Sequence, residues 1–370
     1  KSQGHGRKSR PGRVTAVTSR ERILDAMHLQ EADRVPMSPI ITKGWIAASG
    51  PERTRRLIKE TDSILVVGVA RDIPLGRYGE EYRQVTRDGA TEVHCIGTPK
   101  GDLTQVIRRD VQTTWIMKHF FEDASDVEKF LSIPYHPPRP QVSEWRHWVD
   151  FMGEEGLVLA DIPGAVMLPG SWYSPENFML NYALNRDLIL SLVETANERI
   201  LRFVQRCLDE GIRHFRIVGP ELAAPPLMSP ASFDHLILPF DSKVIDLIRS
   251  RGGVVLVHMH GAIGSMLEQV AALGANALDP LEGPPGGNVD LGEAKRRIGD
   301  RVCLLGNLDD LAVIEAADYD QLYASCQDCL RKAGAGGGYI LGGTSSGLFT
   351  PRLYEQWLVM AEIAREIGSY

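Results

Sequence analysis

Residues 253–283 read GVVLVHMHGAIGSMLEQVAALGANALDPLEG and decide the fold class. The run 253–261 is apolar and rich in β-branched residues, as a buried strand is, and it ends in two histidines. Apolar residues recur at helical spacing over 263–273, and 276–283 is again short and apolar. A strand, a helix that can serve as a crossover and a second strand predict a parallel βαβ unit.

The same alternation continues along the chain in both directions. A first helix is capped by Thr18 or Ser19 and carries Glu21 in its first turn. The other expected strands are RVPMSPI (34–40), SILVVGV (63–69), GLVLADIPG (156–164), HFRIVGPE (214–221), RVCLLGNLD (301–309) and GGYILGGTS (337–345). Further helical patterns cover 188–208, 232–251 and 319–333. Eight strands joined by helical crossovers predict an α/β fold, a (β/α)8 TIM barrel, with residues 18–370 as a single domain.

Two segments do not follow this alternation of strands and helices. Residues 80–109 alternate with period two around turns at Asp88-Gly89 and Lys100-Gly101, which predicts an antiparallel β excursion after the second barrel strand. We expect this insertion to form a lid or wall over the C-terminal mouth of the barrel. Residues 1–17 are basic and rich in Gly, Ser and Pro, which predicts a flexible arm.

Composition narrows the class of protein. Forty-one basic and 48 acidic residues give a net charge of −7, which favours a small-molecule substrate and argues against nucleic-acid binding. No apolar run is long enough for a membrane-spanning helix, and no secretion signal is visible. The odd number of cysteines, five, is typical of a reducing compartment, so we expect a cytoplasmic protein. The glycine-rich run 334–343 begins ahead of a strand, whereas a nucleotide-binding loop follows one, so no nucleotide cofactor is expected.

The candidate site residues are polar side chains at the C-terminal ends of the expected strands, where barrel enzymes carry their active sites. They are Asp161, Glu221, His258, His260, Asp279, Glu282, Asn307, Asp309, Thr344, Ser345 and Ser346. Cys326 and Cys329 form a C-x-x-C pair, but they lie within a helical pattern and are interpreted as structural.

The histidine pair is the most specific of these signals. His258 and His260 are separated by one residue at a strand end, so both imidazoles face the same side. With Glu221 or Glu282 as a third ligand they could hold zinc and leave one position open. The alternative is that both histidines make structural hydrogen bonds or position the substrate.

The two glutamates also have a general-base interpretation. Glu221 lies in GPELAAPP and Glu282 in PLEGPPGG, and the neighbouring prolines stiffen the backbone around each carboxylate. The alternative is that each carboxylate pairs with an arginine or caps the next helix. Asp161, in ADIPG, is a further catalytic candidate.

Several stretches resemble the uroporphyrinogen decarboxylase superfamily over roughly 18–370. They include TSRERILDAMHLQEADRVPM, TPKGDLTQV, VLVHMHG, ALDPLEGPPGGNVDLGEAKRRIGDRVCLLGNLD and GGYILGGTSS. The resemblance implies the TIM-barrel fold, a homodimer and one of two activities, which are decarboxylation of porphyrinogens or methyl transfer involving corrinoid proteins. Asn307, Ser345 and Ser346, at the ends of the last two expected strands, are expected to bind the cofactor.

The departures from the family pattern favour the methyltransferase branch. Decarboxylases of the family carry arginines just after the first strand, whereas this chain reads MSPIITKGWIAASG, with Lys43 as the only base. The methyltransferases resemble VHMHG more closely but have a cysteine where His260 stands and another after the last strand, where this chain has Thr344, Ser345 and Ser346. A zinc site built from N and O ligands would then replace a thiolate site.

The sequence thus predicts an enzyme that moves a methyl group between a methylated small molecule and a corrinoid (cobalamin) presented by a partner protein, with metal assistance. One alternative is a decarboxylase of a porphyrinogen or smaller acid, in which Asp161 or a histidine stabilises the protonation step. Another is a non-catalytic protein that binds a tetrapyrrole or corrinoid.

Overall fold

The fold was obtained as a computed structural model, which describes residues 16–110 and 114–370. Most of the expected N-terminal arm lies outside the described residues. The chain divides into two compact units. Unit 1 comprises 1–66, 149–158 and 276–370, and unit 2 comprises 67–148 and 159–275. Each unit is described by itself, and the single-domain organisation of 18–370 stays a prediction.

Eight parallel strands follow one another in chain order, which confirms the predicted α/β class and the (β/α)8 pattern. The order is β1-β2-β7-β8-β9-β10-β11-β12. Their bounds are β1 Ile40–Thr42, β2 Ser63–Gly68, β7 Gly156–Pro163, β8 His214–Val218, β9 Val254–Met259, β10 Ala277–Pro280, β11 Cys303–Leu308 and β12 Tyr339–Gly343. Strands β9, β10 and β12 are buried along their whole length, as strands covered on both faces are.

In unit 1, β1 pairs with β2, and β10, β11 and β12 pair in turn. The first strand begins later than the sequence predicts, at Ile40 in place of residue 34. Pro36 and Pro39 lack the N–H that a strand ladder needs, so the stretch before Ile40 makes only a bridge, between Met37 and Leu341 of β12. This bridge brings the segment that leads into the first strand beside the last strand.

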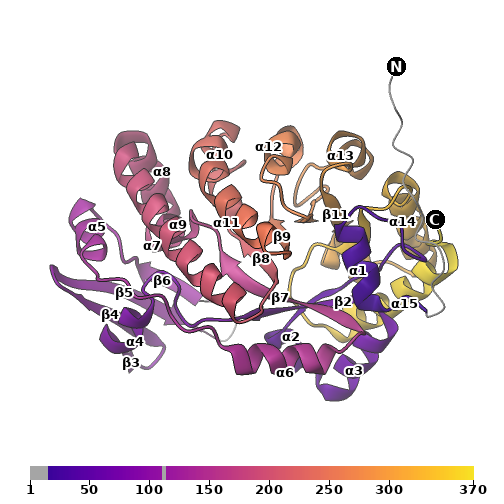
Figure 1. Cartoon of the computed structure of the whole chain (residues 1–370), viewed down its shortest axis with the longest axis horizontal. Helices are drawn as coiled ribbons and strands as arrows, with labels where there is room; N and C mark the ends of the chain where they lie inside the picture. The colour runs from indigo at the N-terminus through magenta and orange to yellow at the C-terminus, as the bar shows by residue number, and fades with distance from the viewer. Residues whose placement is uncertain (1–15, 111–113) are drawn as a thin grey trace. The chain divides into compact units, whose positions relative to one another are not determined.

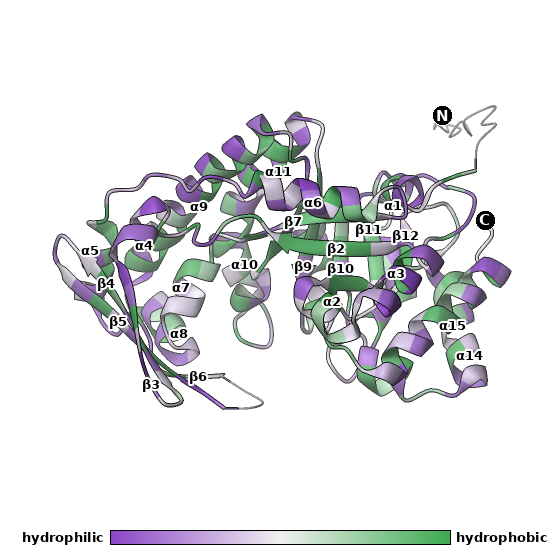
Figure 2. Ribbon diagram, turned by 90° about the horizontal axis from the view of Figure 1, so that it is seen from below, coloured by the Kyte–Doolittle hydropathy of each residue, from purple (hydrophilic) through white to green (hydrophobic). Residues whose placement is uncertain are grey.

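The helices of unit 1 surround these strands. They are α1 Ser19–Met27, α2 Lys43–Ser49, α3 Pro51–Glu60, α13 Leu291–Ile298, the π-helical turn η3 Asp310–Glu315, α14 Tyr319–Ala333 and α15 Pro351–Ile367. The predicted start of α1 is confirmed, because Thr18 and Glu21 form a reciprocal capping box there. Figure 2 shows β2 and β10 in the green of apolar residues.

In unit 2, β7 pairs with β8 and β8 with β9, all parallel. Its helices are α4 Arg77–Tyr82, α5 Ala124–Leu131, α6 Val142–Met152 (which ends in unit 1), α7 Met167–Trp172, α8 Pro175–Leu184, α9 Arg186–Asp209, η1 Pro220–Ala223, α10 Pro230–Leu236, α11 Leu238–Ser250, η2 Ile263–Met266 and α12 Leu267–Ala271. The helix expected over 232–251 is divided at Ile237. Pro239 lies in the first turn of α11, where its missing N–H costs nothing.

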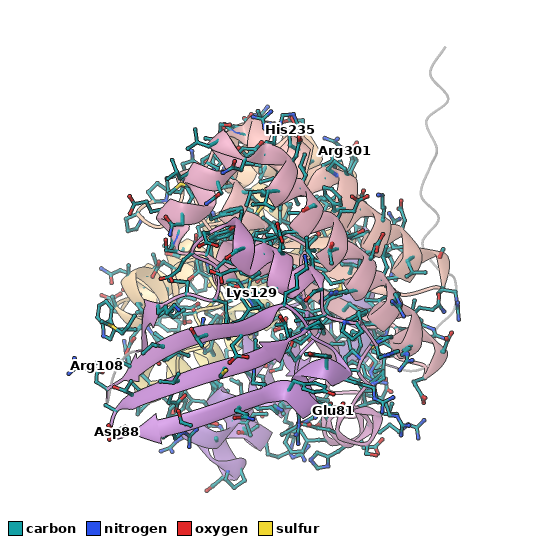
Figure 3. All side chains as sticks on the ribbon, turned by 90° about the vertical axis from the view of Figure 1, so that its left-hand side faces the viewer. Glu81, Asp88, Arg108, Lys129, His235 and Arg301 are labelled. Carbon is teal, nitrogen blue, oxygen red and sulfur yellow. The ribbon has the colours of Figure 1, made fainter. Side chains whose placement is uncertain are left out.

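The predicted antiparallel excursion is confirmed and extends further than expected. It is a four-stranded sheet of β3 Arg83–Asp88, β4 Thr91–Thr98, β5 Gly101–Arg109 and β6 Thr114–Lys118 (Figure 1). The two predicted turns lie between β3 and β4 and between β4 and β5. Figure 3 shows Asp88 and Arg108 at one end of these strands. Across the two described stretches, no helix has both the length and the apolar character needed to cross a membrane.

A buried carboxylate ties the first helix of unit 1 to its first strands. Asp62, which is fully buried ahead of β2, accepts hydrogen bonds from Arg22 Nη1 at 2.6 Å and Arg34 Nη1 at 2.7 Å. Its Oδ2 also accepts from the backbone N–H of Met37 at 3.0 Å. Removing this carboxylate leaves the buried Arg22 without its fully buried ion-pair partner.

We predict that Asp62→Ala lowers the free energy of unfolding by about 3–5 kcal/mol, because one partner of a buried ion pair is removed. The matched control is Asp33→Ala. Asp33 also pairs with Arg22 but is half exposed, so about 1 kcal/mol or less is expected there. Chemical denaturation of both variants measures the difference, and equal losses would contradict a special role for Asp62.

Candidate functional site

The predicted site residues all lie at or just after the C-terminal ends of parallel strands. Four of the eleven candidates belong to unit 2, namely Asp161, Glu221, His258 and His260. The other seven belong to unit 1, namely Asp279, Glu282, Asn307, Asp309, Thr344, Ser345 and Ser346.

In unit 2, Asp161 of β7 pairs with Arg216 of β8. The two residues are direct partners in the strand register, and Arg216 Nε donates to Asp161 Oδ1 at 2.8 Å. Arg216 is largely buried, whereas the side chain of Asp161 is 31% exposed. Asp161 is therefore an oriented carboxylate at the strand end that still reaches the surface of the unit.

The loop after β7 is held by a second buried carboxylate. Asp241, on α11, is buried and accepts the backbone N–H of Ala165 at 2.9 Å. Burial raises the pKa of Asp241 to about 7, although the hydrogen bond from Ala165 opposes this. A Cβ at Gly164 would come within 2.7 Å of Asp241 Oδ2, so only glycine allows the loop to approach this closely.

A cavity of about 300 Å³ opens beside Asp161, with all of its lining in unit 2. Its charged lining residues are Arg71 and Asp72, which follow β2, Arg83 at the start of β3, and Asp161. Met167, Leu168, Trp172 and Ile200 supply apolar walls. Arg83 comes from the inserted sheet, so this insertion contributes to the lining of the cavity. Its expected place over the mouth of the barrel stays a prediction.

Asp72 and Arg83 are site residues that the sequence reasoning missed. Arg83 Nη1 lies 2.9 Å from Asp72 Oδ2, and Asp72 Oδ1 accepts the backbone N–H of Leu75 at 2.8 Å. Burial raises the pKa of Asp72 despite the neighbouring Arg83 cation. Asp72 follows the second parallel strand, and Asp161 lies near the end of the third. The rule that selected polar residues at the C-terminal ends of strands could therefore have found Asp72 as well.

The histidine pair occupies the end of β9. The imidazole rings of His258 and His260 are nearly perpendicular, with their centroids 4.5 Å apart. His258 is buried and lies opposite Val218 of β8, while His260 is partly exposed beyond the strand. Gly261 follows at a φ of +99°, and a Cβ there would lie 3.1 Å from the carbonyl oxygen of Pro225. Glycine at this position lets the chain turn directly after His260.

Glu221 follows β8 in the short helix η1. The turn into η1 passes through Gly219 at a φ of +104°, where a Cβ would collide with Met167. The Oε2 atom of Glu221 is buried and makes no hydrogen bond. Such an acceptor in a native structure calls for a partner, for example a water, a substrate donor or a cation.

The expected three-ligand metal set is not formed. Over 16–110 and 114–370, no three His, Cys, Asp or Glu side chains lie close enough together to hold a metal ion. His258 and His260 supply two imidazoles, but neither Glu221 nor Glu282 completes a set with them. The chemistry considered below therefore contains no step through a metal.

In unit 1, the loop after β12 is fixed by Asp310. This buried carboxylate accepts the backbone N–H groups of Thr344 at 3.0 Å and Ser346 at 2.8 Å. Between them, Ser345 has a φ of +56° and donates its hydroxyl to Asp279 Oδ2 of β10 at 2.9 Å. The structure thus brings together the polar ends of β10 and β12, as predicted.

The remaining candidates of unit 1 are Asn307, Asp309 and Glu282. Asn307 of β11 has its Oδ1 3.8 Å from the thiol of Cys329 on α14. Burial raises the pKa of Cys329 to about 11 and that of Cys326 to about 12, so both thiols stay protonated at neutral pH, in keeping with a structural role. Asp309 caps η3 by accepting the N–H groups of its first turn. Glu282 lies in the loop that follows β10.

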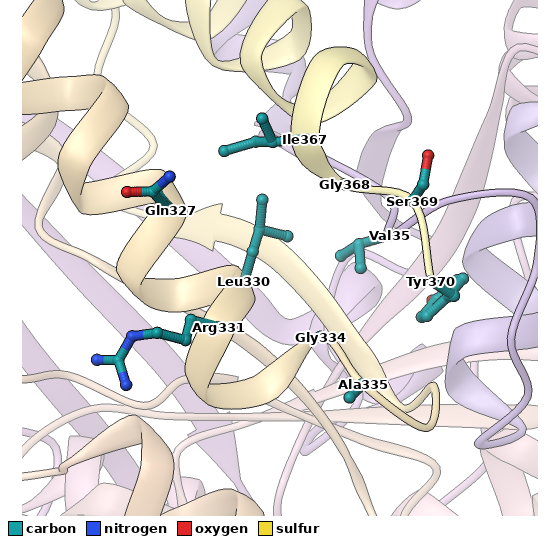
Figure 4. A pocket seen from close by; sticks show the side chains of 10 residues that line it. All are labelled: Val35, Gln327, Leu330, Arg331, Gly334, Ala335, Ile367, Gly368, Ser369 and Tyr370. Carbon is teal, nitrogen blue, oxygen red and sulfur yellow. The ribbon is translucent and has the colours of Figure 1, made fainter.

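A second cavity, of about 350 Å³, lies in unit 1 and contains none of the predicted residues (Figure 4). It is lined by Val35, Gln327, Leu330, Arg331, Gly334, Ala335, Ile367, Gly368, Ser369 and Tyr370. Gly334 and Ala335 precede β12, so this cavity is at the N-terminal side of that strand, away from the end that carries catalytic residues in barrel enzymes.

Comparisons with known proteins identify the family of the chain. The sequence model of the family described as Uroporphyrinogen decarboxylase (URO-D) matches residues 158–366, more than half of the chain. Among curated proteins, the chain is 25% identical over 180 residues to the Methylcobamide:CoM methyltransferase MtaA of Methanosarcina barkeri, a match that covers 49% of this chain and 51% of that protein. It is also 25% identical over 191 residues to the Uroporphyrinogen decarboxylase of Parasynechococcus marenigrum, again covering 49% and 51%.

The chain therefore spans about half the length of these two curated relatives. Among solved structures, a methyltransferase from Methanosarcina mazei superposes with a TM-score of 0.64 at 17% sequence identity, covering 94% of this chain and 98% of that one. At this identity the likeness concerns the fold.

The raised pKa of the buried Asp241 predicts that the free energy of unfolding depends on pH. Its pKa is about 7 in the folded protein against an ordinary value of 3.8, so its stabilising contribution is present below pH 4 and lost as the pH rises to 7. Asp241→Asn keeps an acceptor for the Ala165 N–H without the charge. Between pH 5 and pH 7 we expect the free energy of unfolding of wild type to fall by roughly 3 kcal/mol relative to this variant, at about 1.4 kcal/mol per pH unit. Denaturation curves at both pH values measure the difference, and parallel pH dependences would contradict the assignment.

Proposed function

The chain belongs to the uroporphyrinogen decarboxylase (URO-D) family, and on this premise we propose that it is a methyltransferase that takes the methyl group of a methylated small molecule. A reduced corrinoid, presented by a partner protein, would supply the nucleophile that accepts the methyl group. The relative named as a Methylcobamide:CoM methyltransferase supports this branch of the family.

The proposal rests on the small number of basic residues that follow the first strand. β1 passes directly into α2, KGWIAAS, in which Lys43 is the only cationic residue. A porphyrinogen carries several carboxylates, and a site for it needs matching cations, preferably arginines. The same location thus lacks the chemistry that decarboxylation of such a substrate requires.

The histidines at the end of β9 supply the acid–base chemistry. When a methyl group leaves a heteroatom, that atom keeps the bonding electron pair and must gain a proton. The partly exposed His260 can donate this proton, while the buried His258, 4.5 Å away between ring centroids, positions its ring. Glu221, with its unpartnered Oε2 in the same unit, is a further acceptor for a substrate donor.

Decarboxylation of a smaller acid is the second candidate function, and it is supported by the relatives named as uroporphyrinogen decarboxylases. In that reaction the carbon that loses carbon dioxide keeps the bonding electron pair and must gain a proton. Asp161 would stabilise the positive charge of a substrate that has been protonated before carbon dioxide leaves. Its ion pair with Arg216 holds Asp161 in a fixed orientation, which suits an electrostatic role better than proton donation.

One assay separates the two functions. The purified protein is incubated with cob(I)alamin and a panel of small methyl ethers and methylamines, and methylcobalamin formation is followed by absorbance. In parallel, carbon dioxide release is measured from uroporphyrinogen and from small carboxylic acids. We expect methylcobalamin with at least one methylated compound. Carbon dioxide release without any methyl transfer would reject the proposal in favour of decarboxylation.

We predict that His260→Ala lowers the methyl-transfer rate by about 100-fold or more while the protein stays folded, because a general acid of this kind contributes about 10²–10⁴ in rate. The matched control is His235→Ala. His235 is exposed on α10, and its Nδ1 lies 3.0 Å from the hydroxyl oxygen of Tyr182. Circular dichroism verifies the fold of both variants. Equal activities of the two variants would remove His260 from the mechanism.

A further inference from the structure

The cavity that follows β2 and β7 carries a charge pattern that the proposed reaction does not explain. We propose that this cavity binds the carboxylate of a small, flat substrate through Arg71 and Arg83. The inference rests on the proposed function, because it names a substrate class for it: a methylated carboxylic acid with an apolar body, held in a cavity of the unit that also contains His258 and His260.

Arg83 presents a donor without an acceptor. Its Nη1 is engaged with Asp72 at 2.9 Å, but its Nε is buried and makes no hydrogen bond. The guanidinium is also placed 5.8 Å from the ring centroid of Phe120, which limits its freedom to turn towards water. A buried guanidinium N–H without a partner is costly, and a carboxylate oxygen is the acceptor that suits it best.

Arg71 provides a second cation on the lining of the same cavity. It directly precedes Asp72, its side chain is exposed, and within the described chain it makes no hydrogen bond or ion pair. Arginine has five N–H donors in a planar fork, so the pair Arg71 and Arg83 can approach one carboxylate with several charged hydrogen bonds.

The charge balance of the cavity favours an anion. Asp161 is neutralised by Arg216 at 2.8 Å, and Asp72 is neutralised by Arg83 at 2.9 Å. Arg71 is then left as an excess positive charge. Burial makes Asp72 easier to protonate than an ordinary carboxyl, which strengthens the positive character of this side.

The rest of the lining defines the body of the ligand. Met167, Leu168, Trp172 and Ile200 are apolar, and Trp172 offers an indole that is 8% exposed. A volume of about 300 Å³ is at the lower end of the range for small-molecule sites. An aromatic acid fits this combination of a cationic end, an apolar wall and limited space.

Isothermal titration calorimetry with 4-methoxybenzoate and its neutral analogue 4-methoxybenzamide tests the inference without any turnover. We expect the acid to bind about tenfold or more tightly than the amide. Arg71→Gln and Arg83→Gln should each remove most of this preference. Arg83→Lys, which keeps a charge beside Asp72, should restore part of it and guards against loss of fold in Arg83→Gln.

Arg108→Gln is the matched control, because Arg108 is an exposed arginine of β5 that does not line the cavity (Figure 3). Binding of the acid should be unchanged in this variant. Equal affinities for acid and amide, or equal effects of Arg71→Gln and Arg108→Gln, would overturn the inference. Tight binding of the acid without methyl transfer would leave the carboxylate site standing and count against the proposed function instead.

Discussion

Buried carboxylates that accept backbone N–H groups fix the loops that leave the parallel strands. Asp72 holds Leu75 after β2, Asp241 holds Ala165 after β7, and Asp310 holds Thr344 and Ser346 after β12. The backbone amides of these loops have no strand partner, so each needs an acceptor, and a carboxylate is the strongest one available. The positions of the candidate residues on these loops depend on this set of bonds.

Other contacts fix the orientation of the candidate site residues. His258 belongs to a strand buried along its whole length, and Asp161 is oriented by its cross-strand partner Arg216. Side chains held in this way keep their orientation when a ligand arrives, which lowers the cost of binding and of proton transfer. The inserted antiparallel sheet adds Arg83 to the lining of the cavity in unit 2, so an element outside the barrel pattern contributes one of its walls.

The strands could be predicted because apolar, β-branched runs and their polar ends are local properties of the sequence. The start of the first strand could not be predicted. Pro36 and Pro39 lack N–H groups, and the effect of this loss depends on the ladder that the strand joins. Pairings such as Arg83 with Asp72 and Asp161 with Arg216 could not be read from spacing, because they depend on how an insertion and two strands fold together. The third metal ligand stays a prediction: Glu221 follows a strand end as predicted, but among the described residues no third side chain completes a set with His258 and His260.

We propose that the protein transfers a methyl group and leaves the carboxylate of its substrate in place. The most direct measurement uses 4-methoxybenzoate labelled with ¹³C in both the methoxyl and the carboxyl group, incubated with the protein and cob(I)alamin and followed by NMR. We predict that the methoxyl label moves to methylcobalamin and the carboxyl label remains in 4-hydroxybenzoate. Release of the carboxyl label as carbon dioxide, with the methoxyl group intact, would contradict this account.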